Sequence, residues 1–259
     1  MMSIEWNNTP AALWRGHRAA LRAVRHLDPV RLDTLVGIEQ QKQGLLRNTE
    51  RFLAGLPANH ALLWGARGTG KSSLIKAILN EFHPRGLRLV EVDRDDLIHL
   101  PEIVDEIRDT PWRFILFCDD LSFDHGERAY RSLKSILEGS IELPPDNVRI
   151  YATSNRRHLV PETMQENRDS GLVNGELHYA DAVEEKISLA DRFGLALSFY
   201  SIDQDEYLNI VDRYFSDYEG ERTRLHLAAQ QFAQAKGGRS GRTARQFYNA
   251  WAGEEPLPE

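Results

Sequence analysis

A glycine-rich segment in the first third of the chain has the residue types that bind phosphate groups. It matches the pattern G-x-x-x-x-G-K-[ST] and runs Gly65, Ala66, Arg67, Gly68, Thr69, Gly70, Lys71, Ser72, with Ser73 after it. Glycines let the backbone curl so that successive N–H groups point at phosphate oxygens, and a following helix adds the positive potential of its N-terminus. Lys71 can then reach the β- and γ-phosphates, and the Ser72 hydroxyl can ligate Mg²⁺. The pattern predicts a site for a nucleoside triphosphate with Mg²⁺; a glycine-rich turn that caps a helix is the alternative.

Two adjacent acids end an apolar run further along the chain. Asp119 and Asp120 directly follow residues 114–118. A buried strand that ends in carboxylates is unfavourable unless a cation or a water lies beside them. We expect Asp119 to hold Mg²⁺ through its water shell, and Asp120 to orient or deprotonate the attacking water. A strand that ends in an ordinary polar turn is the alternative, and the phosphate-binding pattern upstream favours the catalytic interpretation.

These residues must be positioned by alternating strands and helices. Short apolar runs predict strands at residues 61–64, 87–92, 114–118, 148–152 and 195–200. Helical patterns lie between them, at residues 72–82 and 129–137. Such alternation predicts an α/β fold, a parallel sheet with helices on both faces, and a ligand at the carboxyl ends of the strands.

The N-terminal segment, residues 1–30, is expected to be helical. Residues 10–27 place apolar side chains near helical spacing, with Arg15, Arg18, Arg22 and Arg25 between them. This pattern predicts an amphipathic helix that packs on the body of the protein. Binding to a membrane surface or to nucleic acid is the alternative role of the arginines.

The chain after residue 200 changes to an all-helical pattern. The ranges 204–215, 222–235 and 242–251 read as helices, and Ser240 is predicted to cap the last of them. We therefore expect an α/β nucleotide-binding domain over residues 31–200 and a helical lid over residues 201–259. Residues 163–182 are polar, with little periodicity, and predict a long loop.

Composition limits the classes of protein that this chain can belong to. It has 259 residues, of which 41% are hydrophobic, so it can bury a sizeable core. The formal net charge of −7 disfavours binding to nucleic acid by charge alone. Cys118 is the single cysteine, so a disulfide within the chain is excluded, which fits the reducing cytoplasm. We find no signal-peptide pattern and no apolar run of the ~20 residues that would cross a bilayer. We expect a cytoplasmic protein.

Together these motifs resemble the AAA+ ATPase superfamily over residues 35–251. The chain is most similar to a bacterial family of predicted AAA+ ATPases of undefined function. The stretches that carry this likeness are Leu62 to Ser73, Ala152 to Leu159, and Glu184 to Gly194. The resemblance implies ATP as the nucleotide, a P-loop NTPase fold with a C-terminal helical lid, and a strand order of 5-1-4-3-2.

The resemblance also implies roles for individual residues. Val36 and Gly37 resemble the adenine-contacting segment, and Asn155 resembles sensor 1, near the γ-phosphate. Arg192 lies in a stretch like the one that carries the arginine finger, which acts on a neighbour's ATP, and Arg242 resembles sensor 2 of the lid. The competing residues are Arg156 and Arg157 for the finger, and Arg245 for sensor 2.

The leading functional hypothesis is an ATPase (ATP and water to ADP and phosphate) that drives conformational work on an unknown protein partner. Because Arg192 would act in trans, we expect a homo-oligomer, at least with ATP bound. One alternative is an ATP-gated binding module with slow or no hydrolysis, since Asp120 stands where many AAA+ motors have Glu. Another is a nucleic-acid motor or a protein like a helicase loader, which the acidic balance disfavours. A small-molecule kinase is disfavoured by the two sensor-like positions.

Overall fold

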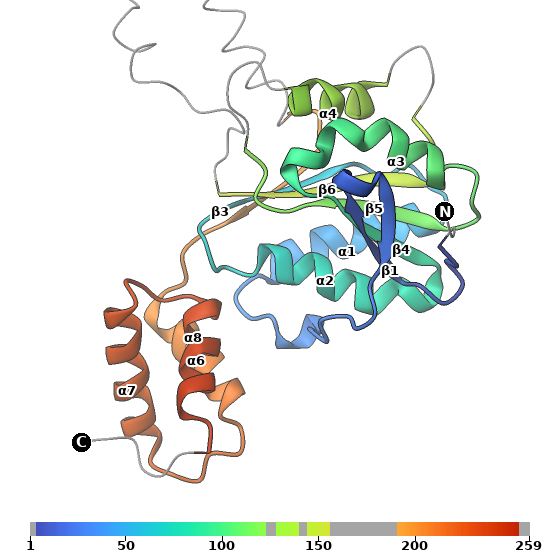
Figure 1. The fold of residues 1–259 in the computed structure, drawn as a ribbon. Helices are drawn as coiled ribbons and strands as arrows, with labels where there is room; N and C mark the ends of the chain where they lie inside the picture. Colours follow the sequence, from blue (N-terminus) through green and yellow to red (C-terminus); the bar gives the residue numbers. More distant parts are fainter. Residues whose placement is uncertain (1–3, 123–127, 140–143, 156–190, 254–259) are drawn as a thin grey trace, which may run out of the picture.

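A seven-stranded sheet forms the centre of the molecule (Figure 1). The computed structural model describes residues 4–122, 128–139, 144–155 and 191–253. The strand order is β2-β1-β4-β5-β6-β3-β7, and every neighbouring pair is parallel except β1 and β2. The strands are β1 Ala11–Arg15, β2 Ala20–Ala23, β3 Ala61–Gly65, β4 Leu87–Glu91, β5 Arg113–Cys118, β6 Val148–Ser154 and β7 Leu195–Phe199. The predicted α/β fold with a mostly parallel sheet is confirmed.

The strand order differs in detail from the expected one. The five strands β3 to β7, numbered in chain order and read from β7, lie in the order 5-1-4-3-2. Beyond β4 the sheet continues through β1 and β2, which the sequence reading did not include. The sheet therefore has two additional strands from the N-terminal segment, and the outermost one, β2, runs antiparallel to its neighbour β1.

The N-terminal segment is a β-hairpin, and the predicted helix over residues 10–27 is wrong. β1 pairs in parallel with β4, and β2 pairs antiparallel with β1. A short 3-10 turn at Gly16–Arg18 joins the two strands, and Ala19 follows in the left-handed conformation, with φ of 44°. Ala11 and Ala12 are small and buried against the sheet. Pairing with β4, which is distant in the sequence, thus overrides a local spacing that suits a helix.

Two hydrophobic cores lie on the two faces of the sheet. Strand β5 shows how they arise, because successive side chains point to opposite faces. Phe114, Leu116 and Cys118 enter one core, and Ile115 and Phe117 enter the other. The first core is covered by α3 (Leu100–Ile107) and α4 (Arg128–Glu138), and the second by α1 (Glu39–Leu53) and α2 (Lys71–Phe82).

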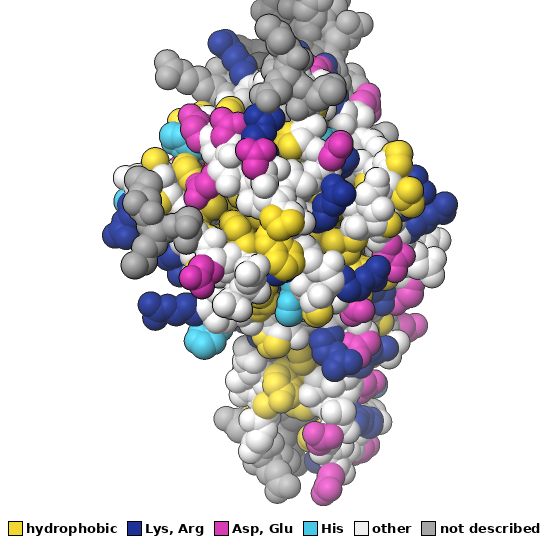
Figure 2. Space-filling view, turned by 90° about the vertical axis from the view of Figure 1, so that its right-hand side faces the viewer, with side chains coloured by type: hydrophobic (Ala, Val, Ile, Leu, Met, Phe, Trp, Pro, Cys, Tyr) yellow, Lys and Arg dark blue, Asp and Glu magenta, His cyan; other side chains and the backbone are white. Residues whose placement is uncertain are grey.

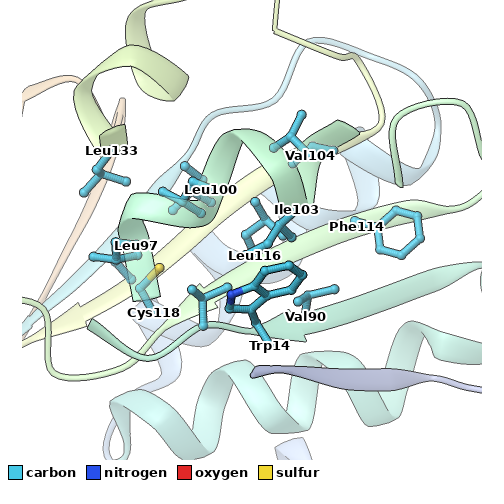
Figure 3. Packing of buried hydrophobic residues seen from close by; sticks show 14 of the residues in the cluster. Trp14, Val90, Leu97, Leu100, Ile103, Val104, Phe114, Leu116, Cys118 and Leu133 are labelled. Atoms are coloured by element: carbon cyan, nitrogen blue, oxygen red, sulfur yellow. The ribbon is translucent and has the colours of Figure 1, made fainter. Parts of the chain in front are cut away.

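The hairpin contributes to both cores: Ala11 enters the second, and Ala12 and Trp14 enter the first. The Trp14 side chain of β1 is 3% exposed and lies in the layer between α3 and the strands (Figure 3). Leu97, in the 3-10 segment η4 (Arg94–His99), is part of the same cluster. The Gly16 N–H also donates to the Asp96 carboxylate over 3.0 Å, which ties the hairpin turn to η4.

The last part of the chain forms three helices with a core of their own. They are α6 Gln204–Tyr214, α7 Arg222–Ala235 and α8 Gly241–Trp251, which confirms the predicted helices there. Their core includes Tyr207, Leu225 and Phe247, all fully buried. Ser240 caps α8 as expected, because its side chain accepts the Thr243 N–H. Among the described helices, none has the length and apolar composition that crossing a membrane requires.

Candidate nucleotide site

The phosphate-binding segment connects β3 to α2, and its glycines are required by its geometry. Gly65 has a φ of 128°, and a Cβ atom on it would lie 1.9 Å from the Phe199 carbonyl oxygen of β7. Gly68 and Gly70 also have positive φ, of 75° and 96°. A side chain at Gly65 would therefore push the loop away from the sheet. The loop leads directly into α2, whose first residue is Lys71.

Lys71 is held at the centre of the loop. Its Nζ donates to the carbonyl oxygens of Gly65 (2.8 Å) and Ala66 (2.6 Å) and to Asn155 Oδ1 (3.3 Å). Burial lowers the pKa of Lys71, and the carboxylates of Asp120 and Asp119 act against that shift. The amine therefore lies between the loop carbonyls and the acidic pair, in the position from which it can turn toward a bound phosphate.

Asp119, at the end of β5, makes contact with the first turn of α2. Its Oδ1 accepts a hydrogen bond of 2.7 Å from the Ser72 hydroxyl, and a second bond from the Thr153 hydroxyl of β6. The two residues expected to serve Mg²⁺ thus lie side by side. A hydroxyl and a carboxylate are oxygen ligands of the kind that Mg²⁺ prefers.

Asp120 has an unusual backbone conformation. Its φ is 53°, in the left-handed region that non-glycine residues seldom adopt, although aspartate tolerates it better than most. Its N–H donates to the Thr153 hydroxyl over 2.9 Å, and its carboxylate accepts from the Asn155 side-chain amide. Thr153 therefore positions both acids at once. Sequence reasoning assigned no role to Thr153, although it stands two residues before Asn155 in the same motif.

The three C-terminal helices close the site from the other side. The Gly241 N–H, at the start of α8, donates to the Gly68 carbonyl over 3.1 Å. A cavity of about 670 Å³ lies between the loop and these helices, within the size range of small-molecule sites. Its apolar lining residues are Val30, Leu35, Val36, Ile38, Ile202, Ile210 and Tyr214.

The structure brings most of the predicted residues into this one cavity. Those that line it are Val36, Arg67, Gly68, Thr69, Gly70, Lys71, Ser72, Ser73, Asp119, Asp120, Asn155 and Arg242. Arg245, the competitor of Arg242, lines it as well. Gly37, Gly65 and Ala66 are not among the lining residues, although the carbonyls of the last two bind Lys71. Sequence reasoning missed Ile202, just before α6, and Ile210 and Tyr214 on α6, because apolar side chains look the same whether they face a core or a ligand.

Arg192 is not among the residues that line this cavity. Its guanidinium Nε donates to the Glu138 carboxylate at the end of α4. The competing arginines at positions 156 and 157, and the predicted loop at residues 163–182, lie outside the described residues.

Fold and site together define an α/β protein with a phosphate-binding loop and a helical C-terminal part, and solved structures share this fold. The structure resembles the RuvB Holliday junction branch migration motor of Thermotoga maritima, with a TM-score of 0.51 and 16% identity over 89% of this chain and 75% of that one. It also resembles the replication initiator DnaA bound to AMPPCP and single-stranded DNA, with a TM-score of 0.56 and 19% identity over 88% of this chain and 67% of that one.

The sequence comparisons then identify the family. The model described as "Protein of unknown function (DUF815)" matches residues 7–255, and the chain belongs to this family. A shorter stretch of 70 residues is 37% identical to the replication factor C large subunit of Ignicoccus hospitalis. That match covers 26% of this chain and 14% of that relative, so it concerns only a small part of the relative's length.

Proposed function

We propose that this protein binds ATP with Mg²⁺ and hydrolyses it to change the position of its lid. The observation that carries the proposal is the convergence of Lys71, Ser72, Asp119, Asp120 and Asn155 at one edge of the sheet, facing the lid. A phosphate-binding loop alone would support only binding. Hydrolysis also needs a carboxylate that is positioned beside the loop to activate water, and Asp120, held by the Asn155 amide, is such a group.

Each group of residues has a stated task in this proposal. The loop N–H groups, the start of α2 and Lys71 hold the phosphates, and the apolar part of the cavity takes the base. Ser72 and Asp119 hold Mg²⁺, which neutralises charge on the phosphates. Asp120, oriented by Asn155, takes the proton of the attacking water. Arg242 reaches the phosphates from α8, so that loss of the γ-phosphate changes how strongly the lid is held.

We also propose that the active form is a homo-oligomer in which Arg192 serves a neighbouring subunit. Arg192 does not line the cavity of its own subunit and is paired with Glu138. An arginine supplied by a neighbour would stabilise the charge that develops in the transition state. Each subunit would then have a complete site only when the next one is in contact.

The test is ATP turnover per subunit over a wide range of protein concentration. Turnover that rises with concentration, and that is lost in Lys71→Ala and strongly reduced in Arg192→Ala, is the expected result. Equal activity of Arg192→Ala and the unmodified protein would rule out the role in trans. No turnover at any concentration, with ATP still bound, would rule out hydrolysis by the protein alone.

A second candidate function is an ATP-gated binding module with slow hydrolysis. The observation that favours it is Asp120, which has a shorter side chain than Glu and is held by Asn155. A water-activating carboxylate that is farther from the phosphate would react slowly. Under this proposal Asp120→Glu should raise turnover, whereas under the first proposal it should leave turnover unchanged or lower it.

A further inference from the structure

The outer edge of β2 is a strand edge without a partner among the described residues. β2 ends the sheet, and β1 is the strand that pairs with it. The Val24 N–H donates to the Ala11 carbonyl over 2.9 Å, so these two residues form a hydrogen-bonded pair. In an antiparallel ladder such pairs alternate, which makes Leu13–Arg22 the next one. The N–H and C=O groups of Leu21 and Ala23 therefore point away from β1, toward the outside.

The same edge carries positive charge without nearby acids in the sequence. Residues 6–27 contain four arginines and two histidines but no Asp or Glu, in a chain whose net charge is −7. Arg18, Arg22 and Arg25 stand before, within and after β2, and all three are exposed. None of the ion pairs between described residues involves them. The charge on this edge is therefore available to an incoming ligand.

The shape of the edge also allows a close approach. Ala20 and Ala23, the first and last residues of β2, have side chains too small to block a neighbouring backbone. Figure 2 looks onto the side of the molecule where β1 lies, and shows hydrophobic side chains gathered in its middle with charged side chains of both signs around them. The opposite edge strand, β7, differs because it contains no arginine and its Ser198 carbonyl accepts the Gln41 side-chain amide.

We propose that β2 is a docking edge for an extended acidic peptide segment of a partner protein, which adds to the sheet as a further strand. The outward N–H and C=O groups of Leu21 and Ala23 would bind its backbone, and Arg18, Arg22 and Arg25 would select carboxylate side chains. A row of alternating donors and acceptors suits a peptide backbone. A phosphate chain has only acceptors and would use the arginines alone.

Two variants separate the backbone edge from the charge. Ala23→Pro removes one outward N–H but no bond to β1, and proline is tolerated at such an edge position. Arg22→Gln removes charge and leaves the backbone edge intact. The probe is a short fluorescein-labelled peptide of alternating glutamate and threonine, titrated in low salt and followed by fluorescence anisotropy. A peptide with lysine in place of glutamate is the matched control.

The proposal expects the glutamate peptide to bind and the lysine peptide not to bind. Each variant should weaken binding by about fivefold, the change that corresponds to one net hydrogen bond or exposed ion pair. Lys71→Ala should bind the peptide as well as the unmodified protein, so this result is independent of any ATPase activity. Absence of binding overturns the proposal. A second result would also overturn it: no peptide binds, but a single-stranded DNA oligonucleotide does, and its binding is weakened by Arg22→Gln and unchanged by Ala23→Pro. The edge would then serve nucleic acid.

Discussion

A hydrogen bond joins the lid to the phosphate loop, and proline at its donor removes the bond and puts a ring carbon in place of the hydrogen. The Gly241 N–H donates to the Gly68 carbonyl, and Gly241 is the first residue of α8. At this first helical position the N–H has no partner inside the helix, and proline is well tolerated there. The preceding Ser240 has φ of −161° and ψ of 162°, an extended conformation that a following proline allows. Gly241→Pro should therefore keep α8 and its cap.

The size of the effect follows from the loss of this bond. A net hydrogen bond stabilises a folded arrangement by about 1 kcal/mol, which is about fivefold in an equilibrium constant. We expect the docked position of the lid to lose at least that much stability relative to the undocked position, because the proline Cδ also crowds the Gly68 oxygen. Because Arg242 and Tyr214 contribute to the cavity only from the lid, ATP affinity should fall by about fivefold or more.

The assay is a titration with a fluorescent ATP analogue in the presence of Mg²⁺. Gly241→Ala is the matched control, because it keeps the N–H, and its Cβ would lie 3.5 Å from the Gly68 oxygen, an ordinary contact. Thermal melting of both variants checks that α8 is intact. If the proline and alanine variants bind equally well and melt at the same temperature, the bond does not help to hold the lid, and the reasoning is refuted.

Three further predictions concern the acidic pair and a buried histidine. Asp120→Asn should lower ATP turnover by about 100-fold or more and leave ATP binding intact, as rapid-quench and binding measurements would show. Thr153→Val should lower the free energy of unfolding by about 1–3 kcal/mol in a denaturant titration, because the Asp120 N–H loses its acceptor and Asp119 loses a donor; an unchanged midpoint would contradict this. Burial and a neighbouring arginine lower the pKa of His60 to about 4, and its Nδ1 accepts the Ile150 N–H. On acidification the histidine is protonated in the unfolded chain at a higher pH than in the folded protein. The contribution of His60 to the free energy of unfolding should therefore be complete above pH ~6.5 and fall by about 3 kcal/mol as the pH drops to about 4. His60→Gln should flatten this part of the profile of stability against pH, and an identical slope would show that His60 is not responsible.

The central strands could be predicted because their signal is local and strong. Residues 114–118 form an apolar run long enough for one strand, and an acid ends it. The phosphate loop is equally local, since its chemistry depends on residues that follow one another in the sequence. For these strands the local residue preferences and the final fold favour the same structure. The predicted and observed strand bounds therefore match within a residue or two.

The N-terminal hairpin could not be predicted in this way. The arginines at positions 15, 18, 22 and 25 are three or four residues apart, which is helical spacing, and a four-residue strand gives too short an alternation to compete. What decides the structure is the pairing of β1 with β4, a contact that no local window contains. Thr153 and the lid residues were missed for the same reason, because their partners are remote in the sequence.

The late formation of the β1–β4 pairing has a consequence for the synthesis of the protein. A ribosome releases residues 11–23 well before residues 87–91, so the hairpin waits for the strand that completes it. During that interval Trp14 has no core to enter, and both edges of the hairpin are open to other chains. We expect the nascent N-terminus to be a binding site for chaperones. Heating or denaturant should also detach the hairpin from β4 before the central strands separate, since the hairpin pairs with the rest of the sheet along only one edge.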